Sequence, residues 1–276
     1  MNTLNFIKRV AKKTGKLVLS EADKKLEIST KAKNDFVTQA DKKAEKLIMN
    51  EIKNKFPDHA FIAEESHVQG DHIDIFNNSR HIWFIDPIDG TRNFTRDIPL
   101  YCISIALFET KAAKTSNNFD YLEGELTHGV VYCPTLDELF YAKKGEGAFL
   151  KTKTSEQKLR VSRISKIEQS ISATGFPPVN KEENLPYFEL MTKKSSAVRR
   201  LGSAALDLCY LAAARFDCFW EFDLKPWDIA AGALIVEEAG GKVTDTNGNL
   251  LDLFGRDILA TNSHLHSKIV EEFGKL

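Results

Sequence analysis

Two early segments of the chain place hydrophobic residues every three or four positions, which is the spacing of one face of an α-helix. Residues 4–19 carry an apolar face opposite a basic one, and residues 38–56 carry a second apolar face. The second segment opens with Thr38-x-x-Asp41, a spacing typical of a helix-capping box. The apolar positions are Leu4, Ile7, Val10, Ala11, Ala44, Leu47, Ile48, Ile52 and Phe56. We therefore predict two amphipathic helices before residue 60.

The pattern changes near residue 60 to short apolar runs separated by turn residues, which is typical of β-strands. These runs are Phe61–Ala63, His81–Ile85, Ile103–Phe108, His128–Tyr132, Glu138–Ala142 and Ala148–Leu150. Between two of them, the polar segment Lys111–Asp120 predicts an excursion within a hairpin.

Beyond residue 150 the pattern predicts strands that alternate with helices. The predicted strands are Ile171–Thr174, Cys218–Phe222, Lys242–Thr244 and Ile258–Ala260, and the predicted helices are Ser203–Phe216 and Trp227–Ala239. We therefore predict an N-terminal α+β region over residues 1–150 and a C-terminal α/β region over residues 151–276.

Composition and charge narrow the class of protein. The 276 residues carry 38 Lys and Arg against 39 Asp and Glu, so no global field favours strong independent binding to nucleic acid or an anionic membrane. The longest nearly apolar run, Ile229–Val236, is too short to span a bilayer, and the N-terminus lacks the apolar region of a secretory signal. Four cysteines lie in apolar stretches without a C-x-x-C pair, which fits buried thiols in a reducing compartment. These features predict a cytoplasmic protein.

The segment HIWFIDPIDGTRNF, residues 81–94, carries the strongest chemical signal. An apolar strand is predicted to end at Asp86, Pro87 turns the chain, and Asp89 then precedes Gly90 and Thr91 at a helix start. A plain turn would explain the proline and glycine. It would not explain two acids after a buried run, where mutual repulsion raises a carboxyl pKa unless a cation intervenes.

Two further places put acids next to predicted elements. Glu64 and Glu65 follow the short strand at residues 61–63, and Asp228 lies in the first turn of a predicted helix. Glu64 could instead face solvent, and Asp228 could be a carboxylate stabilised by the helix dipole. Together with Asp86 and Asp89, however, these oxygen ligands would suit Mg²⁺, Mn²⁺ or Ca²⁺.

Six motifs extend from the first part of the chain to the last. They are KAKNDFVTQAD (Lys31–Asp41), FIAEES (Phe61–Ser66), WFIDPIDGTRNF (Trp83–Phe94), ATGFP (Ala173–Pro177), RRLGSAALDL (Arg199–Leu208) and FWEFDLKPWDIAAGALIVEEAGG (Phe219–Gly241). In this order they resemble the bacterial branch of the inositol monophosphatase family, a group of Mg²⁺-dependent, lithium-sensitive phosphatases. The resemblance implies a layered αβαβα fold, a homodimer, and two or three Mg²⁺ ions in each active site.

The resemblance also assigns roles to residues around the metal site. The implied metal ligands are Glu64, Asp86, the backbone carbonyl of Ile88, Asp89 and Asp228. A water activated by the metal would attack phosphorus, oriented by Thr91 and the acid Asp41, while Glu64 also counts among the catalytic residues. Backbone N–H groups of Gly90 and Thr91 would hold phosphate oxygens. Asp41 also has a structural role as the third residue of the capping box, and both roles are compatible.

A further set of residues is implied to hold the alcohol part of the substrate. This set comprises Asp89, Arg199, Gly202, Ser203, Ala204, Glu221 and Asp228. Glu221 could accept hydrogen bonds from polyol hydroxyls or could form a structural salt bridge. Arg200 could replace Arg199 in this role, and either arginine could serve a dimer contact instead.

Two features of the chain depart from the family pattern: Arg92 stands where many members have a second threonine, and the segment Lys111–Tyr121 is longer than expected.

The expected reaction is hydrolysis of a small phosphate monoester, myo-inositol 1-phosphate or a related polyol phosphate. Same-fold alternatives are phosphatases for fructose 1,6-bisphosphate, 3′-phosphoadenosine 5′-phosphate or histidinol phosphate. An alternative of another class is a dimeric regulatory protein that joins an RNA or transcription complex.

Overall fold

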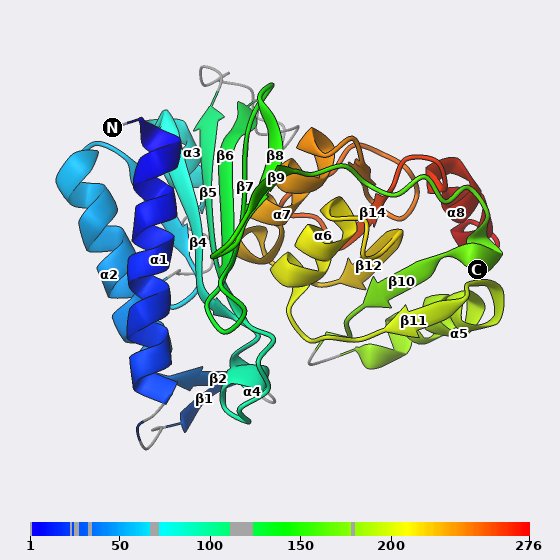
Figure 1. Cartoon of the computed structure of the whole chain (residues 1–276), viewed down its shortest axis with the longest axis horizontal. Coiled ribbons are helices and arrows are strands. Elements are labelled where there is room, and N and C mark those ends of the chain that lie inside the picture. Colours follow the sequence, from blue (N-terminus) through cyan, green and yellow to red (C-terminus); the bar gives the residue numbers. More distant parts are fainter. Residues whose placement is uncertain are drawn as a thin grey trace.

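Five layers, alternately helices and sheets, follow one another along the long axis of the molecule (Figure 1). The computed structural model describes residues 2–22, 24, 28–32, 35–66, 72–110, 124–177 and 180–276. The outer helical layer holds α1 (Thr3–Ala22) and α2 (Gln39–Lys55), which cover one face of the larger sheet. The αβαβα architecture implied by the family resemblance is thereby confirmed.

The larger sheet has seven strands in the order of the chain, β3 to β9. Only β3 and β4 are parallel, and every later neighbour is antiparallel. The strands are β3 (Ala60–Ala63), β4 (His81–Asp89), β5 (Cys102–Thr110), β6 (Gly124–Cys133), β7 (Glu138–Lys143), β8 (Gly147–Lys151) and β9 (Glu156–Lys158). Because β3 and β4 run in the same direction, the residues that follow their carboxyl ends meet at one edge of the sheet.

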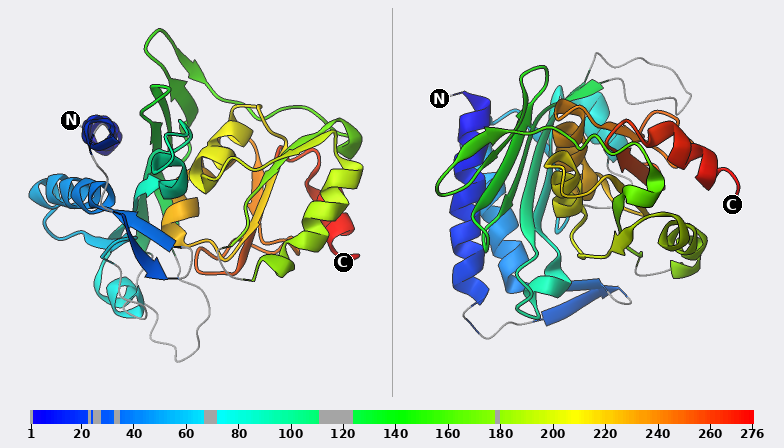
Figure 2. Two further views of the ribbon diagram at one scale, coloured as in Figure 1. Left: turned by 90° about the horizontal axis from the view of Figure 1, so that it is seen from below. Right: turned by 45° about the vertical axis from the view of Figure 1, so that its right-hand side comes forward.

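Two apolar helices, α6 (Ala204–Ala212) and α7 (Pro226–Glu238), form the middle layer between the two sheets (Figure 2). The second sheet has the order β11-β10-β12-β14-β13, with the first three strands parallel. Its strands are β10 (Ile171–Thr174), β11 (Ala197–Arg199), β12 (Cys218–Phe222), β13 (Lys242–Thr244) and β14 (Asp257–Thr261). Helices α5 (Leu185–Lys194) and α8 (His266–Phe273) pack on its outer face.

Smaller elements surround the layers. They are the ribbon β1 (Ile28–Ala32) and β2 (Asp35–Thr38), the helices α3 (His72–Asn78) and α4 (Thr91–Phe94), and the 3₁₀ turns Ile167–Gln169 and Lys181–Glu183. Helix α4 follows β4 directly after Gly90, so the motif at residues 81–94 is a strand, a turn and one helical turn.

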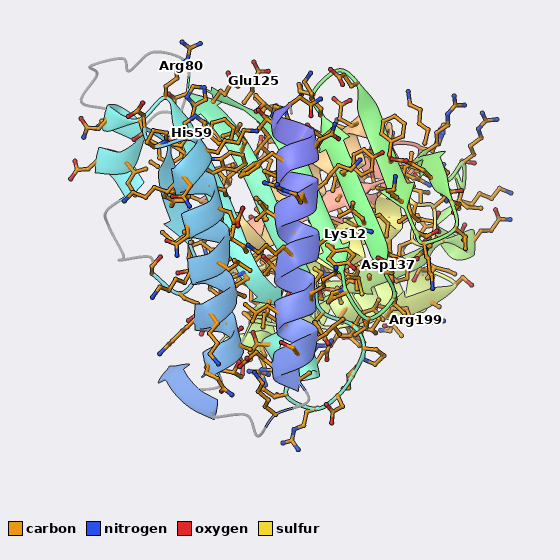
Figure 3. All side chains as sticks on the ribbon, turned by 60° about the vertical axis from the view of Figure 1, so that its left-hand side comes forward. Lys12, His59, Arg80, Glu125, Asp137 and Arg199 are labelled. Carbon is orange, nitrogen blue, oxygen red and sulfur yellow. The ribbon has the colours of Figure 1, made fainter. Side chains whose placement is uncertain are left out.

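Helix α1 is held on the larger sheet by both apolar and polar contacts. Phe6, Ile7 and Val10 are buried against Ile105 and Val130 of the sheet. On the exposed side Lys12 Nζ lies 3.3 Å from Asp137 Oδ1 in the β6–β7 turn (Figure 3). The basic face of α1 therefore contributes to its attachment at this position, although an exposed ion pair adds only about 0–1 kcal/mol.

Most of the expected elements are confirmed, with corrections at their ends. Strand β4 does not end at Asp86, because it continues through Pro87 to Asp89. Pro87 is accommodated in an irregular step, where Asp86 faces Ser104 and Asp89 faces Cys102, so that β4 has one more residue than β5 there. Helix α6 is shorter than expected and ends at Ala212.

Several elements were not predicted from the sequence, among them α3, α5, α8, β9 and β11. The predicted excursion at Lys111–Asp120 lies outside the described residues, but the strands on either side form the expected hairpin, with Thr110 paired to Gly124. The division at residue 150 stays a prediction.

Candidate active site

Four carboxylates approach one another where the larger sheet meets the middle helices. Asp86 and Asp89 lie at the end of β4, and Glu64 follows its parallel neighbour β3, where the Glu64 N–H donates to Ile85 O at 3.1 Å. Asp228 comes from the first turn of α7, which packs on β4 and β5. The Ser104 hydroxyl of β5 donates to Trp227 O at 3.1 Å and so fixes the start of that helix against the sheet.

The electrostatics of this cluster are unfavourable without a cation. Burial, together with repulsion from Glu64, Asp89 and Asp228, raises the pKa of Asp86 well above its usual range. Burial and repulsion from Asp89 and Glu64 raise the pKa of Asp228 to about 8. Burial also raises the pKa of Asp89, although hydrogen bonds from Ser203 and nearby backbone amides act against that shift.

The donor set suits a hard divalent cation, because it consists of carboxylate oxygens at an otherwise repulsive site. Within the part of the chain that the structure describes, no three His, Cys, Asp or Glu side chains form a ready-made metal site. Mg²⁺ does not require such a preformed site, because it binds through one or two carboxylates and keeps waters and substrate oxygens as its other ligands.

Thr91 links the end of β4 to helix α2. Its hydroxyl lies 3.0 Å from Ile88 O and 3.3 Å from Asp41 Oδ1, so its single proton can be donated to either oxygen. The other carboxylate oxygen of Asp41 accepts from the Thr38 N–H at 2.8 Å and the Thr38 hydroxyl at 2.6 Å. Asp41 therefore caps α2 and contacts Thr91 at the same time.

The turn after Asp89 touches the loop before α6. Gly90 has φ +94°, and a β-carbon there would lie 3.0 Å from Leu100 O and 3.2 Å from Gly202 O. Asn93 closes the same contact, since its Nδ2 donates to Leu100 O at 2.6 Å and to Leu201 O at 2.7 Å. Asn93 belongs to the motif at residues 81–94 but had no predicted role, because its partner Leu201 is remote in sequence.

Ser203, Ala204 and Ala205 surround one oxygen of Asp89. The Ser203 hydroxyl and the Ala205 N–H each donate to Asp89 Oδ2 at 2.7 Å. Asp89 thus lies at the N-terminus of α6, where the helix dipole favours a negative charge. The structure thus brings Ser203 and Ala204 to Asp89 and Gly202 to the adjacent Gly90, while their roles toward substrate stay predictions.

Glu221, on β12, extends the acidic region toward the second sheet. Burial, followed by repulsion from Asp228 and Asp89, raises the pKa of Glu221 to about 8, and the Arg200 guanidinium opposes the shift. Arg199 is exposed, and its Nη1 donates to the adjacent Val198 O at 3.2 Å (labelled in Figure 3). Of the two arginines, Arg200 is the one with an electrostatic effect on Glu221, so the predicted substrate role of Arg199 stays a prediction.

A buried carboxylate cluster at the end of a strand, beside a glycine turn within an αβαβα sandwich, is typical of metal-dependent phosphatases that act on small phosphate esters. The sequence profile of the inositol monophosphatase family matches residues 2–276. The chain belongs to this family.

Curated relatives and a solved structure agree with that assignment. An inositol-1-monophosphatase of Caulobacter vibrioides is 38% identical over 89% of this chain and 90% of its own. A fructose-1,6-bisphosphatase/inositol-1-monophosphatase of Thermotoga maritima is 35% identical over 98% and 95%. A putative Nus factor SuhB of Neisseria meningitidis is 36% identical over 97% and 96%. The crystal structure of the extragenic suppressor protein suhB from Bartonella henselae has a TM-score of 0.85, 38% identity and 98% coverage of both chains.

These findings establish the general activity. The protein is an enzyme, a phosphatase of a metal-dependent family that acts on small phosphate esters. Among its described residues, no helix combines the length and the apolar character that crossing a bilayer requires.

Proposed function

We propose that the protein is a Mg²⁺-dependent phosphomonoesterase that releases inorganic phosphate from myo-inositol 1-phosphate or a related polyol or sugar phosphate. The observation that carries this proposal is the group of carboxylates around Asp86, whose raised pKa reflects burial and mutual repulsion. Two divalent cations would neutralise the four carboxylates and relieve that repulsion, and a third would leave positive charge for a phosphate dianion.

The metal would be held by Glu64, Asp86, the Ile88 carbonyl, Asp89 and Asp228, with two or three Mg²⁺ ions in the site. When bound, Mg²⁺ lowers the pKa of a coordinated water and neutralises charge on the phosphate. The hydrogen bonds from Ser203 and Ala205 would orient Asp89, and the Lys225 N–H, which donates to Asp228 Oδ2 at 2.7 Å, would orient Asp228.

Thr91 and Asp41 would orient the attacking water. Asp41 is fully buried and already accepts two hydrogen bonds from Thr38, so its position is fixed before substrate binds. With Asp41 as acceptor, the Thr91 hydroxyl presents a lone pair to a water at the end of β4. The N–H groups of Gly90 and Thr91 would receive phosphate oxygens, because the glycine leaves the backbone accessible.

The alcohol part of the substrate would lie toward the second sheet, against Glu221 and the start of α6. A carboxylate accepts hydrogen bonds from hydroxyl groups, so Glu221 favours an alcohol that carries several of them. The other proposed contacts to the alcohol part are made by Asp89, Gly202, Ser203, Ala204 and Asp228. Arg199 is proposed as one further contact.

The test is phosphate release by the purified protein with and without Mg²⁺. The four substrates are myo-inositol 1-phosphate, fructose 1,6-bisphosphate, 3′-phosphoadenosine 5′-phosphate and histidinol phosphate. We expect Mg²⁺-dependent turnover with the highest kcat/KM on the inositol ester. A higher value on one of the other three would move the assignment to that ester, and the name of the Thermotoga maritima relative makes fructose 1,6-bisphosphate the first alternative.

A regulatory role in transcription is the second candidate, favoured by the name of the Neisseria meningitidis relative. An Asp89→Asn variant separates the two functions, because an amide can still accept the hydrogen bonds from Ser203 and Ala205 but binds Mg²⁺ poorly. If a gene-deletion phenotype is fully complemented by this variant, the phosphatase activity is not the relevant one.

Three further properties are proposed from the family resemblance: a homodimer, a cytoplasmic location and inhibition by lithium. Sedimentation of the purified protein tests the first, and fractionation of cells tests the second. For the third, turnover that is unchanged by lithium at limiting Mg²⁺ would contradict the proposal.

A further inference from the structure

Gly175 and Glu221 are lateral neighbours at the carboxyl ends of two parallel strands. In the register of β10 and β12, Thr174 is paired with Trp220. Gly175 follows Thr174, and Glu221 follows Trp220. Ligands bind beyond the carboxyl ends of parallel strands in such sheets. Gly175 belongs to the motif ATGFP, which has no assigned role in the proposed reaction.

The Glu221 carboxylate occupies the space that a side chain at position 175 would fill. A β-carbon built on Gly175 would lie 1.9 Å from Glu221 Oε1, 2.2 Å from Oε2 and 2.2 Å from the carboxyl carbon. These separations are far shorter than any real contact, so the carboxylate has this position only because residue 175 is glycine. The backbone of Gly175 does not have positive φ, so alanine there would not meet the strain of the left-handed region.

A buried polar network fixes Gly175 relative to Glu221. Asn184 is fully buried, and its Nδ2 donates to Gly175 O at 2.5 Å and to Thr174 Oγ1 at 2.9 Å. Its Oδ1 accepts from Trp220 Nε1 at 2.6 Å, and Thr174 Oγ1 donates to Trp220 O at 2.6 Å. The Asn184 side chain thus joins Trp220, which precedes Glu221, to Gly175, which lies beside Glu221. These hydrogen bonds keep the two strand ends in register.

A cation, Arg200, also acts on the Glu221 carboxylate, because it opposes the rise of the Glu221 pKa. The Arg200 guanidinium is 5.2 Å from the centre of the Phe176 ring, and Phe176 follows Gly175 directly. A guanidinium over an aromatic face is held by a cation–π interaction, which orients it without a hydrogen bond to Glu221. Gly175 therefore provides space for the carboxylate, and Phe176 holds the cation that attracts it.

We propose that Gly175, held by Asn184, is a specificity-determining residue that places the Glu221 carboxylate for alcohols rich in hydroxyl groups. The inference rests on the proposed function, because it assigns Glu221 to the alcohol part of the substrate. Gly175 is a positioning residue in this role, because it acts through Glu221.

The test compares the wild-type protein, Gly175→Ala, Glu221→Ala and the double variant on two phosphate esters. One is myo-inositol 1-phosphate and the other is 4-nitrophenyl phosphate, whose alcohol has no further hydroxyl. We expect Gly175→Ala to lower the ratio of kcat/KM for the inositol ester over the nitrophenyl ester by about tenfold, mainly through KM. In the Glu221→Ala background the same substitution should change that ratio less than about twofold, because the carboxylate is already absent.

The matched control is Gly274→Ala near the C-terminus, where a β-carbon would lie no closer than 3.4 Å to its neighbours. It should keep the wild-type ratio. A crystal structure of Gly175→Ala should show the Glu221 carboxylate displaced, with Asp86 and Asp89 unmoved, which separates repositioning from general damage to the fold.

The inference is overturned if Gly175→Ala keeps the wild-type ratio, or if its effect is as large in the Glu221→Ala background as in the wild type. A wild-type protein that releases phosphate from neither ester would instead contradict the proposed function, and the assignment of alcohol preference would be lost with it. An active wild type with an unaltered Gly175→Ala ratio contradicts the inference alone.

Discussion

His266, at the start of α8, is a buried histidine between two threonine hydroxyls. Its Nε2 lies 3.2 Å from Thr244 Oγ1 and its Nδ1 lies 3.0 Å from Thr261 Oγ1. Burial, with a smaller contribution from Lys242, lowers the pKa of His266 to about 4. The imidazole is therefore neutral in the folded protein at neutral pH and joins α8 to β13 and β14.

This histidine should make the protein less stable in mild acid. Below its ordinary pKa of about 6.5 the unfolded chain binds a proton that the folded chain does not, so stability is lost as pH falls from about 6.5 toward 4. We expect a loss of about 3 kcal/mol in the free energy of unfolding over this window. The measurement is urea denaturation of wild type and His266→Gln at several pH values, and a wild-type curve parallel to that of the variant would contradict the assignment.

The individual acids of the site could be named from the sequence, but their supports could not. Asp86, Asp89 and Asp228 each stand next to an element with a clear hydrophobic pattern, which located them. The role of Asn93 depends on Leu201, 108 residues away, and the role of Asn184 depends on Trp220, 36 residues away. The pattern of neighbouring residues in the sequence cannot predict such a distant hydrogen bond, because the bond forms only when the layers pack together.

Several helix starts carry the polar groups of the site. Asp41 lies in the first turn of α2, Asp228 lies in the first turn of α7, and Asp89 accepts the Ala205 N–H at the start of α6. Each carboxylate thereby satisfies backbone N–H groups that a helix leaves unpaired at its N-terminus. The same contacts hold the acids in place, so helix capping and the geometry of the site depend on each other.

Thr38→Val should therefore affect both helix α2 and turnover. The substitution removes the hydroxyl that accepts from the Ala40 N–H and donates to Asp41, at a cost of about 1 kcal/mol in the free energy of unfolding. Because Asp41 loses one of the groups that fix it beside Thr91, we expect kcat to fall several-fold with KM little changed. Urea denaturation and steady-state kinetics measure the two effects.

Thr38→Ser is the control, because it keeps the hydroxyl and should stay near wild type in both measurements. A Thr38→Val protein that loses stability but keeps full kcat would show that the capping box does not position the Asp41 and Thr91 pair.

Elements with a long apolar pattern were predictable, and short or terminal ones were not. Helix α2 begins after Thr38 as its capping box indicated. The three-residue strands β9 and β11 are too short for a period to be read from the sequence, and α8 has only 8 residues, although it buries Ile269 and Phe273. The sequence predicts a strand that ends at Asp86 and a turn at Pro87, yet Pro87 occupies an irregular step within β4, where a missing N–H is tolerated.

At the scale of the whole molecule, one hydrophobic core spans both sheets. The cluster that contains Phe84 and Phe140 of the larger sheet also contains Phe219 and Ile258 of the second, with α6 and α7 between them. Helix α7 packs on strands β4 to β8 of the larger sheet and also contacts β13. These two helices cover the inner faces of both sheets.

We therefore expect the two halves to unfold together. Differential scanning calorimetry should give one transition whose calorimetric and van't Hoff enthalpies agree, and a fragment of residues 1–150 should not fold alone because it lacks α6 and α7. Two separate transitions, or a folded fragment, would show that the regions predicted at residue 150 are independent domains.

The central claim is that the carboxylates around Asp86 bind the Mg²⁺ that drives ester hydrolysis, and it is tested most directly by the Mg²⁺ dependence of phosphate release. Wild type and Asp89→Asn are compared on myo-inositol 1-phosphate over a range of Mg²⁺ concentrations, with folding checked by circular dichroism. We expect saturable dependence on Mg²⁺ in the wild type and a loss of at least about a hundredfold in kcat/KM in the folded variant. Phosphate release that is independent of Mg²⁺, or equal in the two proteins, would contradict it.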